Sequence, residues 1–292
     1  MTSANLALEQ LGFSYGSTDV LSQLDFSLEP GSVTGLLGRN GSGKTTLMRV
    51  ALGLLKAGKG SATLFGETAW QASPQVRARI GYVPQDSQAF SWLRVGDCLR
   101  LVGSFYDTWD DQLIRRYVHE WEIDESRYIH DLSTGQRQKV AILTAIGHRP
   151  DLLVLDEPVA GLDPGARRQF LKALVELNED LDRTILFSTH ITSDIERVVA
   201  DVAVLHGGRL TYRGELDALK ERCRRLYLNG TAMPEQIVEP GIENYQQLGD
   251  RGSAFTRAWD PAKVNALAKN LGVQIEAESL PLEELFLELT HG

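Results

Sequence analysis

A short glycine-rich loop constrains this chain more than any other feature. Residues 38–46 read GRNGSGKTT and satisfy the pattern G-x-x-x-x-G-K-[ST] from Gly38 to Thr45. An apolar run at residues 28–37 precedes the loop and residues at helical spacing follow it, which predicts strand, loop and helix in that order. In such a loop, backbone N–H groups converge on phosphate oxygens and the helix N-terminus adds positive potential. A glycine turn carrying a solvated lysine is the alternative, and the flanking strand and helix disfavour it.

Two side chains of this loop have expected roles in binding a nucleoside triphosphate with Mg²⁺. Lys44 would bridge the β- and γ-phosphates, and Thr45 would ligate Mg²⁺ through its hydroxyl. The loop residues expected to bind the nucleotide are Gly38, Asn40, Gly41, Ser42, Gly43, Lys44, Thr45 and Thr46.

An acidic pair ends a second apolar run, at residues 152–158, which read LLVLDEP. The carboxyl end of a buried parallel strand is where doubly wound sheets place ligands. Asp156 suits the Mg²⁺ shell, whereas Glu157 suits a group that accepts a proton from, or orients, an attacking water. Two solvated acids at a strand end are the alternative, which the phosphate loop disfavours.

Strands and helices alternate along most of the chain, which favours a doubly wound, mainly parallel sheet. Short strands are expected at residues 61–84 and a mostly helical insertion at about 86–148, and Gly58 and Gly60 are expected to end the loop helix. Further strands are expected at 152–155, 184–188 and 202–205, with a helix at 167–177.

A third pattern, LSTGQRQK at residues 132–139, opens another helix. Ser133 and Gln136 form a capping box there, and Gly135 leaves the helix end open to phosphate. With the phosphate loop and the acidic pair, this pattern makes the chain resemble the ATP-binding subunit of ATP-binding-cassette (ABC) transporters, whose signature reads LSGGQ. In that family the signature contacts the γ-phosphate held by the other subunit's phosphate loop. The resemblance therefore implies that two copies meet head to tail.

Four further motifs of the family appear in the expected order. Tyr15, in FSYG, matches the aromatic residue that stacks on adenine, and packing beside Phe13 is the alternative. Gln85, in YVPQ, matches the glutamine that senses Mg²⁺, water and the transmembrane partner, and an ordinary turn residue is the alternative. Asp163, in AGLD, matches the aspartate that links the two sites across the dimer. His190, in FSTH, matches the switch histidine that contacts the γ-phosphate and helps to position the water.

Two residues depart from the family's pattern. Thr134 replaces a glycine of the signature, and because helical angles tolerate threonine we expect an altered phosphate contact rather than its loss. Gly161 stands where the family often has serine, which removes a hydroxyl at the interface. We expect both departures to alter the rate of ATP turnover and to leave the type of reaction unchanged.

The resemblance implies a fold and a set of site residues. The implied fold is α/β, a P-loop NTPase of the ABC type. Residues 1–215 would form the ATPase domain, with a mainly parallel sheet core, an antiparallel β subdomain and the helical subdomain. Residues 216–292 would form a small α+β accessory domain. Catalysis is assigned to Glu157, His190, Lys44 and Gln85, and Mg²⁺ ligation to Thr45, Gln85 and Asp156. Nucleotide contacts outside the loop are assigned to Tyr15, Ser133, Gly135, Gln136 and Asp163.

The implied function is Mg²⁺-dependent ATP hydrolysis that drives transport across the cytoplasmic membrane through a separate integral membrane subunit. The tail PLEELFLEL is similar to the ends of ATPases from two-component exporters and favours export. No stretch approaches the roughly 20 apolar residues of a membrane helix and no signal peptide is recognisable, so we expect peripheral attachment to the inner face of the membrane. Cys98 and Cys223 fit neither a disulfide framework nor a zinc site, which suggests a reducing compartment.

Two other functions are alternatives. A soluble ABC ATPase of DNA repair or translation is disfavoured by the single unsplit cassette, and the formal net charge of -9 disfavours binding to nucleic acid. A nucleotide-binding regulator without useful turnover is disfavoured because Lys44, Asp156, Glu157 and His190 are all present.

Two segments have more than one interpretation. Aromatic residues gather at residues 90–121, where they either fill the helical core or partly line a groove for a helix of the membrane subunit. In the family that helix docks beside the segment after the glutamine matched by Gln85, which makes Trp92 a candidate for the groove. The last helix, with Ser279 as its expected N-cap, carries an apolar stripe that packs on its own small sheet or makes a dimer or regulatory contact.

Overall fold

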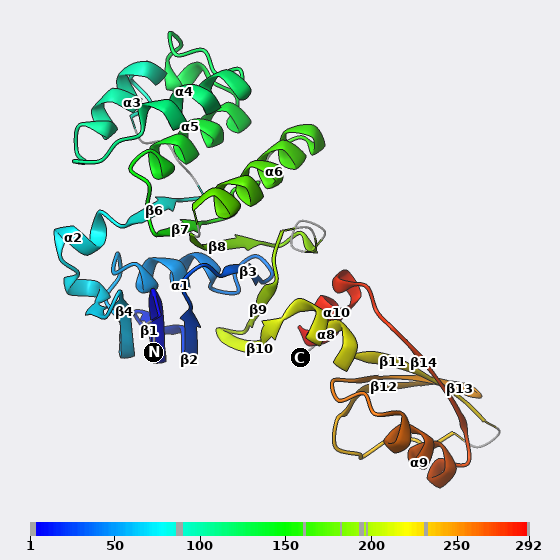
Figure 1. Ribbon diagram of the computed structural model, residues 1–292. Helices are drawn as coiled ribbons and strands as arrows, with labels where there is room; N and C mark the ends of the chain where they lie inside the picture. Colours follow the sequence, from blue (N-terminus) through cyan, green and yellow to red (C-terminus); the bar gives the residue numbers. More distant parts are fainter. Residues whose placement is uncertain are drawn as a thin grey trace.

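Three β-sheets organise the chain (Figure 1). The computed structural model describes residues 4–85, 90–159, 162–181, 183–192, 196, 198–230 and 233–290, with side chains of 162–181 described as far as residue 176. A six-stranded sheet lies at the centre, a four-stranded antiparallel sheet begins the chain, and another four-stranded sheet lies toward the C-terminus. In the described residues, no helix has the length and apolar character needed to cross a lipid bilayer.

The central sheet is mainly parallel, as the alternation of strands and helices predicts. In spatial order its strands are β10 (Arg209–Glu215), β9 (Asp201–His206), β3 (Val33–Leu37), β8 (Thr184–Thr189), β7 (Leu152–Leu155) and β6 (Ile80–Val83). The five strands from β9 to β6 are parallel, and β10 pairs antiparallel with β9. Strands β7 and β8 are buried along their whole length, which is typical of parallel strands covered on both faces.

Helices cover both faces of this sheet (Figure 1). On one face, α1 (Lys44–Ala51) shares a buried cluster with alternate strand residues such as Leu186. On the other face, α5 (Thr134–Ile146) and α6 (Pro164–Leu181) share a second cluster with residues such as Phe187. The expectation that Gly58 and Gly60 end α1 is wrong: the helix ends at Ala51, and Gly53 turns the chain with φ of 68°.

The helical insertion follows the prediction, whereas residues 61–84, expected to form short strands, hold two short helices as well as strands. The sheet has the order β2 (Thr18–Leu28), β1 (Leu6–Tyr15), β4 (Lys59–Leu64) and β5 (Glu67–Thr68). The short helices η1 (Ala69–Gln71) and α2 (Pro74–Arg77) lead from it to β6. Between β6 and β7 lie α3 (Val95–Gly103), α4 (Asp111–Glu120), η2 (Ile129–Asp131) and α5.

The aromatic residues of this insertion divide between core and surface. Tyr117 and Trp121 are buried in the same cluster as α5, at 1% and 8% exposure. Trp92 and Phe105 are instead 67% and 71% exposed. The two interpretations of this segment therefore apply to different residues.

The C-terminal sheet is antiparallel and carries helices of its own. Its strands, in spatial order, are β12 (Ile242–Leu248), β13 (Arg251–Thr256), β11 (Arg224–Asn229) and β14 (Gln274–Glu278). The helices are α8 (Leu216–Arg222), α9 (Pro261–Leu271) and α10 (Leu282–Leu289). Val264 of α9 joins Leu226, Leu228 and Ala254 of the sheet in a small buried cluster.

Helix α10 does not pack on this sheet alone. Its four buried residues belong to the large cluster that also contains Leu219 of α8, Val202 of β9 and Phe255 of β13. The helix thus lies where the C-terminal sheet meets the central one (Figure 1). Those four residues are Leu282, Leu285, Phe286 and Leu289.

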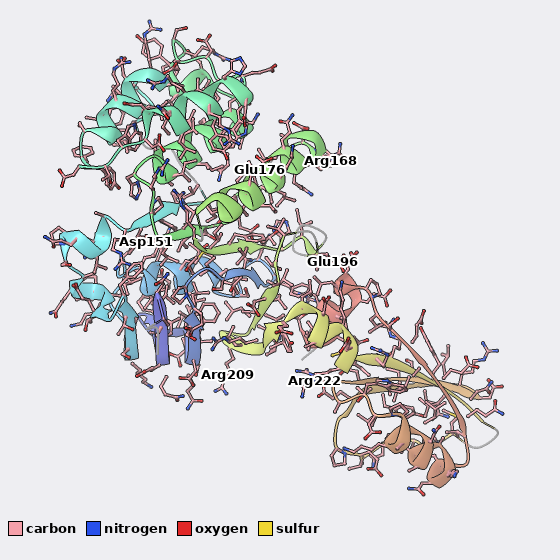
Figure 2. The ribbon with its side chains drawn as sticks, in the orientation of Figure 1. Asp151, Arg168, Glu176, Glu196, Arg209 and Arg222 are labelled. Atoms are coloured by element: carbon pink, nitrogen blue, oxygen red, sulfur yellow. The ribbon has the colours of Figure 1, made fainter. Side chains whose placement is uncertain are left out.

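Ion pairs accompany this packing. Arg225 of β11 pairs with Glu284 and Glu288 of α10, the second at 2.9 Å. Lys220 Nζ of α8 lies 2.8 Å from Glu196 Oε1, which Figure 2 labels at this junction. The expected cap is wrong, because α10 begins at Leu282 with Pro281, rather than Ser279, as its N-cap residue.

Candidate functional site

A cavity of about 360 Å³ lies at the end of the phosphate loop and gathers residues from four segments of the chain. Nine of its ten lining residues are ones the sequence singles out, and Val20 is the tenth. The lining residues are Tyr15, Val20, Asn40, Gly41, Gly43, Lys44, Thr45, Thr46, Gln85 and Glu157.

The glycines of the loop are needed for its backbone path. Gly41 and Gly43 have φ of 79° and 104°, in the region that favours glycine. A Cβ atom on Gly38 would lie 2.4 Å from Ser42 Oγ and 2.9 Å from the Leu205 carbonyl oxygen. Among the described residues, no side chain caps the start of α1, so its first N–H groups are available to an anion.

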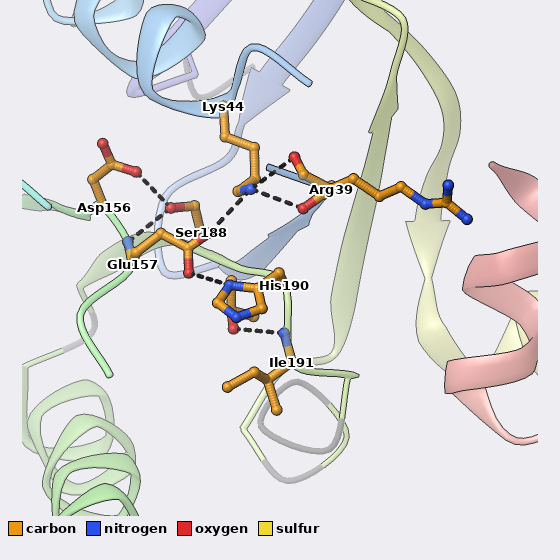
Figure 3. Close-up of polar contacts among 9 residues, drawn as sticks. Arg39, Lys44, Asp156, Glu157, Ser188, His190 and Ile191 are labelled. Carbon is orange, nitrogen blue, oxygen red and sulfur yellow. Dashed lines mark hydrogen bonds and ion pairs between the residues drawn. The ribbon is translucent and has the colours of Figure 1, made fainter. Parts of the chain in front are cut away.

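Lys44 and Glu157 meet in this cavity, and His190 contacts Glu157 beside it (Figure 3). The Lys44 ammonium donates to the Gly38 carbonyl at 2.8 Å and to the Arg39 carbonyl at 3.3 Å. Its Nζ lies 3.0 Å from Glu157 Oε1, while His190 Nδ1 lies 2.7 Å from Glu157 Oε2. Lys44 and Glu157 are 6% and 4% exposed, so their charges interact with little screening.

Asp156, which is fully buried, presents one free oxygen in this arrangement. Ser188 Oγ donates to Asp156 Oδ1 at 2.7 Å and accepts from the Glu157 N–H at 2.9 Å. Within the described part of the chain, Asp156 Oδ2 is buried and has no hydrogen-bond partner. A free carboxylate oxygen, with the Thr45 hydroxyl and the Gln85 amide lining the cavity, fits the oxygen ligands that Mg²⁺ prefers.

The charge of Asp156 also acts on a neighbouring strand. Tyr82 lies on β6, which pairs with β7 directly before Asp156. Burial, and after it the Asp156 carboxylate, raises the pKa of the Tyr82 phenol. Tyr82 therefore stays protonated and neutral next to the acidic pair.

Tyr15 packs beside Phe13, as one of its two sequence interpretations expects. Its ring packs edge-on against Phe13, with centroids 4.8 Å apart, yet the residue is 49% exposed and lines the cavity. One ring surface therefore remains available for stacking.

The signature residues lie outside this cavity. Ser133 and Gln136 form the expected capping box at the start of α5: Gln136 N–H donates to Ser133 Oγ at 3.3 Å, and Ser133 N–H to Gln136 Oε1 at 3.0 Å. Gly135 and Asp163 do not line the cavity either. Nine expected site residues therefore line the cavity and His190 and Asp156 adjoin it through Glu157, whereas the signature residues lie outside it.

Asp163 has a local structural role. Its carboxylate accepts from the N–H groups of Ala166 and Gly165 at the start of α6, at 3.0 and 2.8 Å. These hydrogen bonds, Ala166 first, lower the pKa of Asp163 below its usual range. Gly161, one of the two departures from the family pattern, lies outside the described residues.

Ser188 is the residue that sequence reasoning missed. It stands two positions before His190 in FSTH, on a buried strand where a hydroxyl needs a partner. A serine within an apolar strand is the signal that the sequence offers, but its partners directly follow β7, and only the pairing of β7 with β8 identifies them.

Comparisons with known proteins identify relatives of this chain. The sequence model of a family described as "ABC transporter" matches residues 21–160. The Nod factor export ATP-binding protein I of Cupriavidus pinatubonensis is 33% identical over 298 residues, covering 98% of this chain and 91% of that protein. The bacitracin transport ATP-binding protein BcrA of Bacillus licheniformis is 31% identical and covers 95% of this chain and 94% of its own length.

Solved structures give the same picture for the fold. An ATP binding subunit of an ABC transporter superposes with a TM-score of 0.67 at 28% identity, covering 75% of this chain and 92% of that one. CbiO1 from Clostridium perfringens, described as part of the ABC transporter complex cbiONQ, superposes with a TM-score of 0.62 at 30% identity, covering 73% of this chain and 88% of that one.

Proposed function

The chain belongs to the ABC transporter family as an ATP-binding subunit whose ATP hydrolysis drives transport through a separate membrane subunit, and we propose that this hydrolysis requires Mg²⁺. We also propose that the chain acts as a head-to-tail dimer and that the direction of transport is export. The convergence of Lys44, Glu157 and His190 at the phosphate loop is the observation that carries the catalytic part of this proposal.

Each group of the cavity has a proposed task in hydrolysis. The loop amides and Lys44 hold the β- and γ-phosphates, so the Lys44 ammonium leaves Glu157 when the triphosphate enters. Glu157 then accepts the proton of the attacking water, and His190 orients the Glu157 carboxylate through Nδ1. Thr45, Gln85 and Asp156 would hold Mg²⁺, which when bound would supply positive charge to the phosphate oxygens.

The separate surface of the signature supports a dimer. Ser133, Gly135 and Gln136 do not line the cavity of their own chain, and the family resemblance implies that they complete the site of a second copy. The γ-phosphate then bridges two chains, and its loss on hydrolysis removes that bridge. The family resemblance implies that Asp163, six positions after Glu157, links the two sites.

The dimer predicts a difference between two substitutions of Ser133. Asp and Asn cap helices equally well, so both preserve the start of α5, but Ser133→Asp adds a negative charge that repels the phosphate. In a Glu157→Gln background, we expect Ser133→Asn to dimerise with ATP and Ser133→Asp to remain monomeric, as measured by light scattering. Both should bind ATP alike as monomers, and equal dimerisation of the two would contradict the trans arrangement.

The relatives favour transport over the soluble alternatives. Those named above act in Nod factor export and bacitracin transport, and their similarity extends over nearly the whole chain. We therefore propose export, with the protein attached to the inner face of the cytoplasmic membrane by its membrane partner.

Co-purification tests this proposal. The tagged full chain is isolated from gently solubilised membranes, and its partners are identified by mass spectrometry. A polytopic membrane protein in near-stoichiometric amount is expected. Recovery with ribosomal or DNA-bound partners instead would support the soluble alternatives.

Trp92 is expected to contribute to the contact with this partner. Its side chain is 67% exposed just before α3, and large aromatic side chains dominate the energy of protein interfaces. Trp92→Ala should reduce recovery of the membrane protein by about tenfold or more while leaving thermal stability and ATP binding unchanged. Phe105→Ala removes an equally exposed aromatic residue and is the matched control, so equal losses in both would argue against a specific role of Trp92.

A further inference from the structure

We propose that Ser188 is a positioning residue for the acidic pair, whose hydroxyl fixes the Asp156 oxygen offered to the metal and the backbone that carries Glu157. This inference rests on the proposed function, because it concerns the same Mg²⁺ and ATP site. It goes further by giving a task to Ser188, a residue of FSTH other than the switch histidine.

Strand pairing brings Ser188 to the acidic pair. Leu155 of β7 is paired with Phe187 of β8, so the next residues along the parallel strands, Asp156 and Ser188, lie side by side. Ser188 is fully buried, and its hydroxyl has two partners: it donates to Asp156 Oδ1 at 2.7 Å and accepts from Glu157 N–H at 2.9 Å (Figure 3). One hydroxyl therefore contacts both acids.

The first hydrogen bond determines which Asp156 oxygen is free. With Oδ1 held by Ser188, Oδ2 is the atom without a partner in the described part of the chain. Partners that hydrogen-bond a metal-ligating group fix its orientation and contribute to metal affinity. Without the Ser188 hydroxyl, the Asp156 carboxylate loses the hydrogen bond that restricts its rotation about the Cβ–Cγ bond.

The second hydrogen bond supports an unfavourable backbone conformation at Glu157. This residue has φ of 51°, in the left-handed region that non-glycine residues seldom adopt. Its N–H is held by Ser188, while its carboxylate lies between Lys44 and His190. Ser188 thus helps to keep the carboxylate directed into the cavity.

A purely structural role of Ser188 makes a different prediction from a positioning role. A buried hydroxyl that only satisfies its partners stabilises the fold and leaves metal affinity unchanged. Thr184 provides the matched control, because it is a buried hydroxyl at the opposite end of the same strand. Its Oγ1 accepts from Asn5 at 2.7 Å and from Gly31 at 3.1 Å, and donates to Glu29 at 3.3 Å.

The test uses Mn²⁺ as a spectroscopic probe of the metal site. Full-length Ser188→Ala and Thr184→Ala are compared with the unsubstituted chain, each bound to ATP, and free Mn²⁺ is followed by electron paramagnetic resonance. We expect Mn²⁺ affinity to fall by about 10- to 100-fold in Ser188→Ala and to stay within about twofold in Thr184→Ala. ATP affinity in EDTA should change by less than about twofold in both variants, because the acidic pair then holds no metal.

Two results would overturn the inference. One is unchanged Mn²⁺ affinity in Ser188→Ala, and the other is an equal loss in Thr184→Ala, which would indicate general loosening of β8. Failure of the proposed function is a distinct outcome, because the unsubstituted chain would then add nothing to the Mn²⁺ affinity of ATP alone.

Discussion

Glu157→Gln should bind ATP, hydrolyse it at least about a hundredfold more slowly than the unsubstituted chain, and accumulate as a dimer with ATP. A positioned general base typically contributes 10²- to 10⁴-fold to a rate, and an amide of the same shape accepts a proton poorly. The substitution also removes a negative charge 3.0 Å from Lys44 Nζ, so the lysine becomes free to engage the triphosphate. Turnover by phosphate release, ATP affinity and light scattering together measure the three expectations.

Asp151→Asn is the matched control for this substitution. Asp151 directly precedes β7, at the end opposite to the acidic pair, and is an exposed acid paired with Arg79 (Figure 2). Its neutralisation should leave turnover within about twofold, because exposed ion pairs contribute little. Full turnover in Glu157→Gln would exclude Glu157 as the base and point to another acceptor for the proton.

Gly53→Ala should destabilise the fold by about 3 to 5 kcal/mol, the largest stability loss we expect from a single methyl group. A Cβ atom on Gly53 would lie 2.0 Å from the carbonyl oxygen of Ala69, which is backbone and unable to rotate away. The residue also has φ of 68°, which disfavours any side chain. Because this turn ends α1, relief of the collision must shift either the helix behind the phosphate loop or η1.

Gly66→Ala separates the collision from the backbone strain. Gly66 has φ of 86°, but nothing lies within 4 Å of its Cβ position. Its substitution should cost only about 1 to 2 kcal/mol, the penalty of the left-handed conformation. Unfolding in urea, followed by circular dichroism, compares the two variants, and equal losses would show that the Gly53 turn adapts to a side chain.

Local chemistry explains what could be predicted from the sequence. The phosphate loop, the acidic strand end and the capping box of Ser133 and Gln136 each depend on residues within one short segment, so their spacing is sufficient. The parallel sheet follows from the alternation of apolar strands with helices. The family resemblance predicts site roles for Gln85 and His190, because a glutamine or a histidine alone does not indicate a nucleotide site.

Tertiary contacts explain what could not be predicted. The role of Ser188 depends on the pairing of β7 with β8, which brings residues 32 positions apart within 2.7 Å. The end of α1 depends on the close approach of Gly53 to Ala69. From the sequence alone, Gly58 and Gly60 are the glycines expected to end the helix. The position of α10 depends on a surface contributed by α8 and β9, whereas its own stripe only indicates that some apolar partner exists.

The position of α10 has a consequence for how such chains can exchange parts by recombination. A breakpoint after residue 215 separates the sequence neatly, yet α10 buries its apolar face in a cluster that reaches Val202. A chimera joined there would place a foreign helix against native partners, and its new contacts would include a foreign α8 beside Glu196. Chimeras between relatives should therefore fold only when strand β9 is transferred together with the C-terminal region, because side chains of both segments pack in one buried cluster.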